Sequence, residues 1–273
     1  MQRLGLIAGN GRFPFLLADN ARKQGVEVVA VALEDEASPE LEQHVAKLHW
    51  ASIAKLGRVI KLLKDEGITQ AVMAGGVTKA KLYQRFSLKL IPDIRTMGVL
   101  YKRSRDHRDH TLLAAVADEF VAEGIEFRNT LEFLGDHIAH EGCMTKRQPT
   151  ERERDDVEFG WGVGKAIAEM QIGQTLVVKD KCVVAVEAVE GTDAAVQRGG
   201  ELARGDAVVI KLSRPNQDFR FDVPTIGTRT IDTLKAAGVS ALAVEADKTL
   251  MLDKPEVIAA ADACRIAIVG HAG

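Results

Sequence analysis

Strand-like segments that alternate with helices occupy the first third of the chain, and this alternation limits the fold more than any other feature. Largely apolar runs at 4–9, 26–33 and 69–76 have the length and composition of buried strands. Helical periodicity fills 15–25 and 56–67, and both segments stop at a glycine. Strands and helices that alternate at this spacing form βαβ units with a parallel sheet. The sequence therefore predicts a Rossmann-like parallel sheet in the N-terminal part of an α/β protein.

A polar connector separates the two halves of the chain. We expect an N-terminal Rossmann-like domain at 1–132, a linker at 133–150 and a C-terminal catalytic domain at 151–273. In the second domain, the apolar run at 175–179 predicts one of several strands, and 241–253 predicts a hairpin or strand pair. Helical segments lie between these strands, so the second domain is predicted to be a mixed α/β domain.

The composition excludes several classes of function. The chain has 273 residues, a net charge of −3 and 5% aromatic residues, so it offers neither a broad basic field nor many stacking side chains for nucleic acid. The three cysteines form no CxxC pair, which favours a reducing compartment. No apolar run in the sequence is long enough to span a bilayer. We therefore expect a protein that does not bind nucleic acid and that is either cytoplasmic or peripheral at the inner membrane, on which it would lie without crossing it.

Two loops of small residues follow predicted strands, at the edge where open parallel sheets bind ligands. The first loop places Gly9 and Gly11 on the dinucleotide pattern GxGxxG, but Pro14 stands at the third glycine position. Pro14 argues against a nicotinamide cofactor, whereas two glycines at a helix start still suit a phosphate or a sugar. The alternative interpretation, that both loops are only tight turns and bind no ligand, stays open. The candidate ligand-binding residues are Gly9, Asn10, Gly11, Gly75, Gly76, Thr78 and Lys79.

Acidic residues follow a predicted strand in the second domain. Glu187 and Glu190 come just before Gly191, Thr192 and Asp193. In one interpretation, Thr192 or Asp193 caps the next helix and the glutamates are exposed. In the other, backbone N–H groups of Gly191 and Thr192 bind a phosphate at the helix N-terminus, and the acids hold a hard cation.

The stretch RPNQDFRFDVPTIG combines a period of two with a set of charges. In DFRFDV, two phenylalanines and a valine alternate with two aspartates and an arginine, which predicts an extended segment with one buried face. The charged face would present Asp222 and Arg220, with Lys211 close by in the sequence. Carboxylates among cations suit phosphoryl chemistry, in which acids hold Mg²⁺ and water attacks. A surface ion-pair cluster is the alternative.

Taken together, five motifs resemble one known family. They are GLIAGNGRFP, AGGVTK, QIGQTLVVKD, VVAVEAVEGTDA and RPNQDFRFDVPTIG, and they cover nearly the whole chain in order. The family is that of the LpxI-type UDP-2,3-diacylglucosamine pyrophosphatases of lipid A biosynthesis. The resemblance implies two domains with the substrate held between them. It also implies Mg²⁺-dependent hydrolysis of UDP-2,3-diacylglucosamine to lipid X and UMP, with water attacking the α-phosphorus.

The resemblance also suggests site residues. Asp222 falls on the aspartate of the family's FDVPTIG-type motif, which implies a role in metal binding and catalysis, and we expect Glu190 as a second metal ligand. On this hypothesis Phe219 and Phe221 pack the segment onto the second domain. Asn10 stands where some members have a further glycine. The expected substrate-binding residues of the second domain are Gly191, Thr192, Asp193, Lys211, Gln217 and Arg220.

A substrate with acyl chains would need apolar surface as well as charge. The stretch 78–103 mixes leucines and a phenylalanine with lysines and arginines, which suits contact with an anionic membrane, although an ordinary amphipathic helix and loop would look similar. We expect a lipid-linked nucleotide sugar as substrate, and leave a homodimer open. Two other functions are weighed: a nucleotide-dependent oxidoreductase on the Rossmann-like domain, and a non-catalytic regulator that binds the UDP-sugar lipid.

Overall fold

The computed structural model describes residues 2–78, 92–103 and 109–273. The chain divides into two compact units. The first unit comprises Met1–Leu134 and Phe219–Phe221, and the second comprises Gly135–Asp218 and Asp222–Gly273. The predicted fold class is confirmed, because the first unit contains a parallel sheet and the second a mixed one.

The sheet of the first unit has the strand order β3-β2-β1-β4-β5, and all neighbours are parallel. Its strands are β1 (Arg3–Ala8), β2 (Glu27–Leu33), β3 (Lys47–Ala51), β4 (Gln70–Ala74) and β5 (Glu126–Phe127). The chain builds outward from β1 to β3 and then returns to add β4 on the other side of β1. The direction of winding therefore changes between β1 and β4, which is where open α/β sheets bind ligands.

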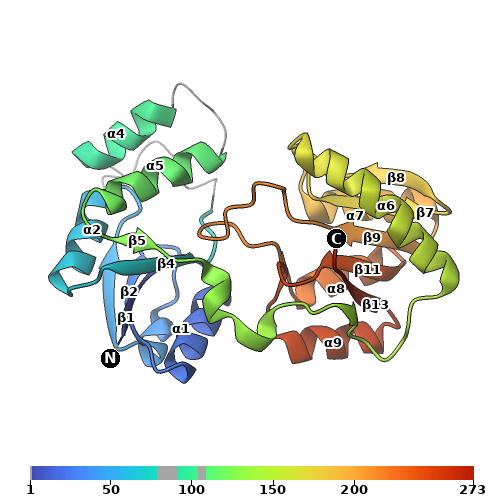
Figure 1. Cartoon of the computed structure of the whole chain (residues 1–273), viewed down its shortest axis with the longest axis horizontal. Coiled ribbons are helices and arrows are strands. Elements are labelled where there is room, and N and C mark those ends of the chain that lie inside the picture. The colour runs from blue at the N-terminus through green and yellow to red at the C-terminus, as the bar shows by residue number, and fades with distance from the viewer. Residues whose placement is uncertain (1, 79–91, 104–108) are drawn as a thin grey trace. The chain divides into compact units, whose positions relative to one another are not determined.

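Helices cover both faces of this sheet (Figure 1). Leu4 and Leu6 point to the face covered by α1 (Phe13–Lys23), whereas Ile7 belongs to the core on the other face. That second core is built with α2 (Leu56–Asp65) and α5 (Asp109–Val121). Burial on both faces explains why these strands read as continuous apolar runs. The remaining elements are α4 (Ile94–Arg103) and the short 3₁₀ helices Pro39–His44 and Thr130–Phe133.

The second unit contains a six-stranded sheet with the order β6-β13-β11-β9-β7-β8. Its strands are β6 (Gly142–Cys143), β7 (Thr175–Lys179), β8 (Cys182–Val186), β9 (Ala207–Lys211), β11 (Val239–Glu245) and β13 (Ala267–His271). The strands β9, β11 and β13 are parallel, and the outer pairs are antiparallel. The expected pairing within 241–253 is wrong, because β12 (Leu250–Met251) pairs in parallel with β10 (Thr225–Ile226) instead.

Four helices and one short 3₁₀ turn complete the second unit. They are α6 (Glu151–Glu169), α7 (Thr192–Ala203), α8 (Thr228–Ala236), α9 (Lys254–Ala263) and the turn Gly135–His137. One core contains α6 side chains and the other contains side chains of α7, α8 and α9, and in Figure 1 α6 and α9 lie on opposite sides of the strands.

Glycines allow α6 and α7 to pack closely. A Cβ on Gly160 of α6 would lie 2.2 Å from Ile210 Cδ1, and one on Gly200 of α7 would lie 2.2 Å from Ala237 O. Gly200, part of a glycine pair that lowers helix propensity, therefore serves close packing in the folded protein.

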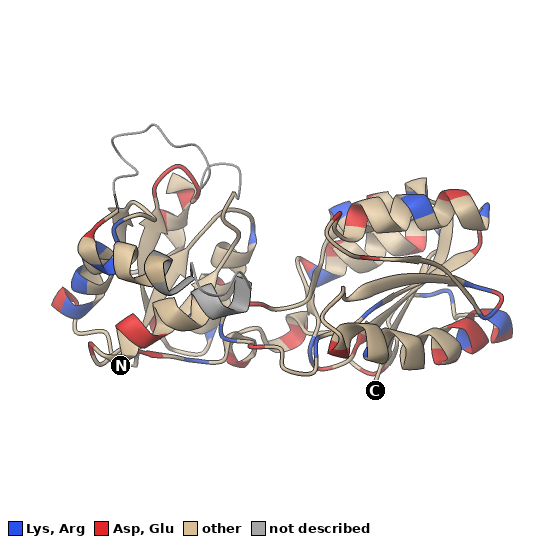
Figure 2. Ribbon diagram, turned by 90° about the horizontal axis from the view of Figure 1, so that it is seen from above, with Lys and Arg blue, Asp and Glu red and all other residues tan. Residues whose placement is uncertain are grey.

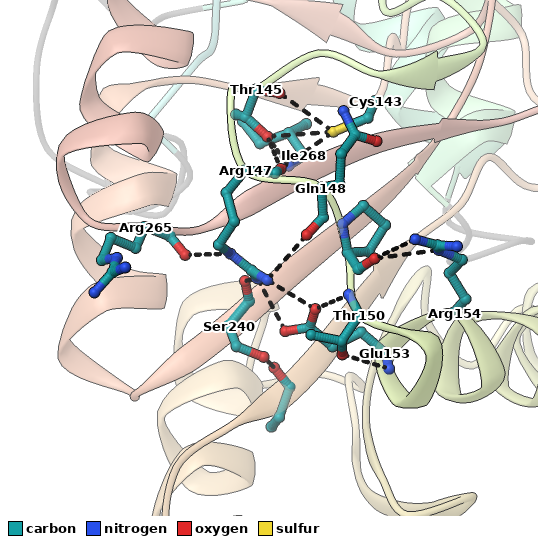
Figure 3. A network of polar contacts seen from close by, with 12 residues as sticks. Cys143, Thr145, Arg147, Gln148, Thr150, Glu153, Arg154, Ser240, Arg265 and Ile268 are labelled. Atoms are coloured by element: carbon teal, nitrogen blue, oxygen red, sulfur yellow. Dashed lines mark hydrogen bonds and ion pairs between the residues drawn. The ribbon is translucent and has the colours of Figure 1, made fainter.

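The segment expected as a linker, 133–150, is divided between the two units. Phe133 is buried in the core of the first unit, and β6 joins the sheet of the second through β13. Cys143 Sγ lies 3.3 Å from the backbone carbonyl of Arg147, within the turn that follows β6 (Figure 3). The end of the segment is thus an ordered part of the second unit.

Arg147 and Glu153 fix this turn to the start of α6 (Figure 3). The guanidinium donates to both carboxylate oxygens of Glu153 at 2.9 Å, and also to the carbonyls of Arg265 and Ser240. Glu153 in turn accepts the Thr150 N–H at 2.7 Å, which closes a capping box. Burial opposes ionisation of Glu153, but hydrogen bonds from Arg147 and its neighbours lower its pKa to about 2.

We expect Glu153→Gln to lower the free energy of unfolding by about 2 kcal/mol at neutral pH, because the amide cannot replace the bidentate charge pair. The pKa of Glu153 is lowered from 4.5, so its contribution is complete above pH 4.5 and is lost as the pH falls toward 2. Urea unfolding between pH 7 and pH 3 would measure both effects. A wild-type and Glu153→Gln pair with parallel pH profiles would contradict this assignment.

The segment around Asp222 is a turn and not an extended ribbon, so the prediction drawn from its period of two is wrong. The Asp222 N–H donates to the Asp218 carbonyl at 3.0 Å. The Phe219 carbonyl accepts the Thr130 N–H, and the Phe221 ring packs edge-on against Phe127 at 5.3 Å between centroids. Phe219–Phe221 therefore belong to the first unit, which corrects the expectation that they anchor on the second.

Acidic and basic residues are interspersed over the helices of both units, and the strands are mostly free of charge (Figure 2). This distribution agrees with the absence of a broad basic field in the sequence. In the part of the chain that the structure describes, the helices are too short or too polar to cross a bilayer.

Candidate functional site

The loops after β1 and β4 meet in the first unit. Asn10 donates its N–H to the Gly76 carbonyl at 2.8 Å, and Gly76 donates to the Asn10 carbonyl at 3.1 Å. The Gly9 N–H donates to the Ala74 carbonyl at 2.9 Å. Two loops that the sequence singled out separately thus form one structure, at the point where the sheet changes its direction of winding.

Glu36, which follows β2, ties these loops together and was missed by sequence reasoning. Its carboxylate accepts the Asn10 side-chain amide at 2.7 Å, the Thr78 N–H at 3.2 Å and the Thr78 hydroxyl at 3.0 Å. An acid after the second strand is a known feature of Rossmann-like sheets, where it binds a ribose hydroxyl, and this signal was available in the sequence.

The glycines of these loops have different roles. A Cβ on Gly9 would lie 2.3 Å from the Gly76 carbonyl oxygen, and one on Gly75 would lie 2.5 Å from that of Asn10. Gly75 also has a φ of +91°. Gly11 has a φ of +88°, but a Cβ there would meet no atom within 4 Å. Gly9 and Gly75 are therefore needed for the two loops to meet. Gly11 is not needed for that contact, and the space beside its Cα is open. Lys79 lies outside the described residues.

In the second unit, Lys211 at the end of β9 is the centre of a charged cluster. Its ammonium donates to the Thr225 carbonyl at 3.0 Å. Burial lowers the pKa of Lys211, and the carboxylates of Glu187, Asp193 and Asp222 act in the opposite direction. The structure therefore brings the predicted residues Lys211, Asp193 and Asp222 near one another, together with Glu187.

The carboxylate of Glu187 is held in place by the residue just before β7 and by the first residue of α7. Its carboxylate accepts the Thr192 hydroxyl at 2.9 Å and the Gln174 N–H at 3.3 Å. Gly191, with a φ of +87°, occupies the N-cap of α7, and no side chain caps the helix. The interpretation of Thr192 or Asp193 as the cap is therefore wrong, because the Thr192 hydroxyl bonds to Glu187 instead.

Glu190 has other partners. Arg198 donates to one carboxylate oxygen at 2.7 Å, and the Ala188 N–H donates to the other at 3.1 Å. Backbone N–H groups and Arg198 lower the pKa of Glu190. Unlike Glu187, Glu190 is not among the carboxylates that act on Lys211. The structure thus separates the two glutamates, which lie three positions apart in the sequence.

Gln217 fixes the loop that carries Asp222. Its side-chain oxygen accepts the Arg214 N–H at 3.1 Å, and its side-chain NH₂ group donates to the Asp222 carbonyl at 2.8 Å. Gln217, predicted to bind substrate, therefore positions Asp222, whose side chain is exposed. The Arg220 guanidinium lies over the Phe221 ring, 4.9 Å from its centroid, in the first unit.

Two buried polar atoms near this cluster have no hydrogen-bond partner among the described residues: Gln174 Oε1 and Arg214 Nε. The backbone of Gln174 bonds to the Glu187 carboxylate and to the N–H of Leu212, two residues before Arg214. Buried acceptors and donors are almost always paired, so an unpaired acceptor and an unpaired donor at one sheet edge suit a polar ligand.

The donor set of the cluster fits Mg²⁺ only in part. Within the described ranges, no group of three or more histidine, cysteine or acidic side chains is arranged to hold a metal ion. Mg²⁺, however, is usually bound through one or two carboxylates plus substrate phosphates and water. Asp222 and Glu187 are the candidates for that smaller set of ligands, since both carboxylates raise the pKa of Lys211.

The fold and the two candidate sites define an α/β protein of two units. Each unit carries candidate ligand-binding residues at the end of a parallel strand: the loops after β1 and β4 in the first unit, and the cluster around Lys211 in the second. The chain belongs to the LpxI family. Residues 3–137 match the LpxI N-terminal domain, and residues 140–269 match the LpxI C-terminal domain. It is similar to a protein of Caulobacter vibrioides named UDP-2,3-diacylglucosamine pyrophosphatase LpxI. The two are 35% identical over 280 residues, which covers 99% of this chain and 98% of that protein.

The family resemblance predicted from the motifs is confirmed by these matches, and with it the expectation that the chain is an enzyme. Solved structures are more distant. A biotin carboxylase domain of a thermophilic 2-oxoglutarate carboxylase is 11% identical with a TM-score of 0.25, covering 65% of this chain and 35% of that one. N5-carboxyaminoimidazole ribonucleotide synthetase from Thermotoga maritima is 14% identical with a TM-score of 0.24, covering 70% and 42%. Neither similarity carries an argument.

Proposed function

We propose that this protein hydrolyses the pyrophosphate bond of UDP-2,3-diacylglucosamine in lipid A biosynthesis, using Mg²⁺. Water attacks the α-phosphorus, and the bond from this phosphorus to the bridging oxygen breaks. The water oxygen remains in UMP, the bridging oxygen leaves with 2,3-diacylglucosamine 1-phosphate (lipid X), and a proton is released. The family membership supports the reaction, and the cluster around Lys211 is the structural observation that carries the proposal.

We further propose that Asp222 and Glu187 hold the metal, in place of the expected pair Asp222 and Glu190. Glu190 already bonds to Arg198, whereas Glu187 acts on the same ammonium as Asp222. Bound Mg²⁺ would neutralise phosphate oxygens and so make the phosphorus more open to attack. The exposure of Asp222 leaves its carboxylate accessible to an incoming diphosphate.

The other residues of the second-unit cluster suit a diphosphate. Lys211 offers a half-buried cation whose position is fixed by its hydrogen bond to the Thr225 carbonyl. The N-terminus of α7 offers backbone N–H groups that no side chain caps, and helix N-termini favour anions. The unpaired Arg214 Nε adds a donor. These groups would bind phosphate oxygens in place and need little rearrangement during reaction.

The loops of the first unit are proposed to bind a second part of the substrate. Gly9, Asn10, Gly11, Gly75, Gly76 and Thr78 form one structure at the change of winding, where ligands of such sheets bind. Glu36 keeps this structure in shape. The chemistry of these loops, backbone N–H groups beside open space at Gly11, suits hydroxyl and phosphate oxygens.

The test is incubation of the full-length protein with UDP-2,3-diacylglucosamine in ¹⁸O-labelled water, with Mg²⁺ or with EDTA. We expect UMP and lipid X with Mg²⁺, the label in UMP, and no product with EDTA. Label in lipid X would overturn attack at the α-phosphorus, and activity in EDTA would overturn the metal requirement. Tight binding without UMP release would identify a regulator, and bound nicotinamide would identify an oxidoreductase.

A further inference from the structure

Glu245, at the end of β11 in the second unit, is a buried carboxylate that the proposed reaction does not use. The four residues before it in the strand, 241–244, are apolar and fully buried, and Glu245 itself is 2% exposed. Moving a charge out of water costs free energy, so a carboxylate is tolerated at such a position only where donors surround it. An apolar side chain would fill the end of β11 without this cost if packing were the only requirement.

Four donors surround the Glu245 carboxylate, two on each oxygen. Lys165 from α6 and Lys248 donate to one oxygen, each at 2.8 Å. Ser213 donates to the other oxygen, through its N–H at 2.8 Å and through its hydroxyl. Burial opposes ionisation, but these hydrogen bonds lower the pKa of Glu245 to about 2, so the carboxylate is charged at neutral pH. One oxygen is therefore neutralised by lysines, and the other holds Ser213.

The bonds to Ser213 extend the sheet beyond the end of β9. The pairing of β9 with β11 ends at Lys211. The Leu212 N–H then donates to the carbonyl of the residue before β7, and the Ser213 N–H donates to the Glu245 carboxylate on the side of β11. The Glu245 side chain therefore takes the place of the backbone carbonyl that a longer ladder would supply, and it holds the chain two residues past β9.

The loop that carries Asp222 begins directly after Ser213. The Gln217 side chain accepts the Arg214 N–H at 3.1 Å and donates to the Asp222 carbonyl at 2.8 Å, so it joins the start of the loop to Asp222. The bonds between Ser213 and Glu245 tie this start to the sheet. A shift of Ser213 would therefore be passed through Gln217 to Asp222, and it would also move Arg214, whose buried Nε has no partner among the described residues.

We propose that Glu245 is a positioning residue for the hydrolysis: through Ser213 it fixes the start of the loop 214–222 and so keeps the Asp222 carboxylate in place. This role rests on the proposed function, in which Asp222 holds the metal. Glu245 is buried beneath the loop's first residues and acts on the reaction only through them. A catalytic group misplaced by about 1 Å can cost about 10²-fold in rate. Because Gln217 continues to restrain Asp222, we expect loss of the Glu245 carboxylate to lower kcat by about tenfold.

The test compares three variants of the full-length protein by kcat for UMP release and by hydrogen exchange of peptides that cover 213–222. Glu245→Gln should show the tenfold lower kcat and faster exchange in this loop, because an amide cannot accept from all four donors. Ser213→Ala removes only the hydroxyl bond and leaves the carboxylate paired with both lysines, so it should fold and change both quantities in the same direction by a smaller factor. The matched control is Glu153→Gln. Glu153 is also a buried carboxylate of the second unit, but its partners are Arg147 and Thr150, so this variant should keep the wild-type kcat and loop exchange.

A repeat of Glu245→Gln in an Asp222→Asn protein separates positioning from general destabilisation. If Glu245 acts through the Asp222 carboxylate, its replacement should lower the remaining kcat by less than about twofold, because the group that it positions is gone. An equal factor in both proteins, a wild-type kcat for Glu245→Gln, or loop exchange no faster than in Glu153→Gln would overturn the role of Glu245. Wild-type protein that releases no UMP, or Asp222→Asn with normal turnover, would instead reject the proposed function, and loop exchange would still show whether Glu245 holds the loop.

Discussion

Replacement of Asp222 by asparagine should lower kcat by about 10³-fold, because the variant loses the negative charge that would hold the metal and order the attacking water. Asp222 is exposed, and its backbone is fixed by Gln217 and by the turn to Asp218. The fold should therefore survive, with a change in unfolding free energy of less than about 0.5 kcal/mol. Steady-state UMP release and urea unfolding measure the two quantities.

Two further variants make this result specific. Asp232→Asn removes an exposed aspartate from α8 without touching the cluster and should keep wild-type turnover. Gln217→Ala keeps the Asp222 carboxylate but removes the side-chain bond to its carbonyl, so it should lower kcat less than Asp222→Asn does. Near wild-type turnover of purified Asp222→Asn would remove Asp222 from the mechanism.

Lys211→Met should have the second largest effect on enzyme activity. Methionine retains most of the apolar length of the side chain but leaves Glu187, Asp193 and Asp222 without their shared cation. We expect kcat/KM to fall by about 10²-fold, because the diphosphate would meet three carboxylates without the half-buried cation that offsets them. Affinity for UMP, measured by calorimetry, should fall as well, which a purely structural role would not require.

The stability of the Lys211→Met variant provides a separate check. The Thr225 carbonyl loses its hydrogen bond, which costs about 1 to 2 kcal/mol, while removal of a buried charge acts in the opposite direction. A small change in melting temperature together with a large loss of activity would support the proposed role. The control is Lys235→Met, an exposed lysine in the last turn of α8. If both variants behave alike, Lys211 has no special function.

Several parts of the fold follow from sequence for a local reason. The strands of the first unit are buried on both faces, so their apolar character is continuous and does not depend on which residues lie opposite. The ends of the helices near Gly25 and Gly67 are likewise predictable from local sequence, because both positions have a positive φ, which favours glycine. The family could also be identified from sequence, because its motifs are runs of neighbouring residues and do not depend on the tertiary structure.

Other predictions from the sequence were wrong or incomplete where a residue's contact partner lies far along the chain. DFRFDV has the period of a strand, but the Phe221 ring packs against Phe127 and the Phe219 carbonyl accepts the Thr130 N–H. A turn packs Phe221 against the core as a strand could, and no residue near it in sequence distinguishes the two. Glu36 shows the same limitation, because its partners Asn10 and Thr78 lie on two other loops.

The choice between Glu187 and Glu190 illustrates what each level determines. Amino-acid sequence alone established the class of fold, the family and the set of acids and cations available, because those depend on local pattern. Which acid faces Lys211 depends on strand pairing: Thr175 lies opposite Lys211 in the sheet, and the Glu187 N–H donates to the Thr175 carbonyl. Such pairings join residues 12 to 36 positions apart. Only the tertiary structure decides them, because a carboxylate acts on a charge through distance in space and not along the chain.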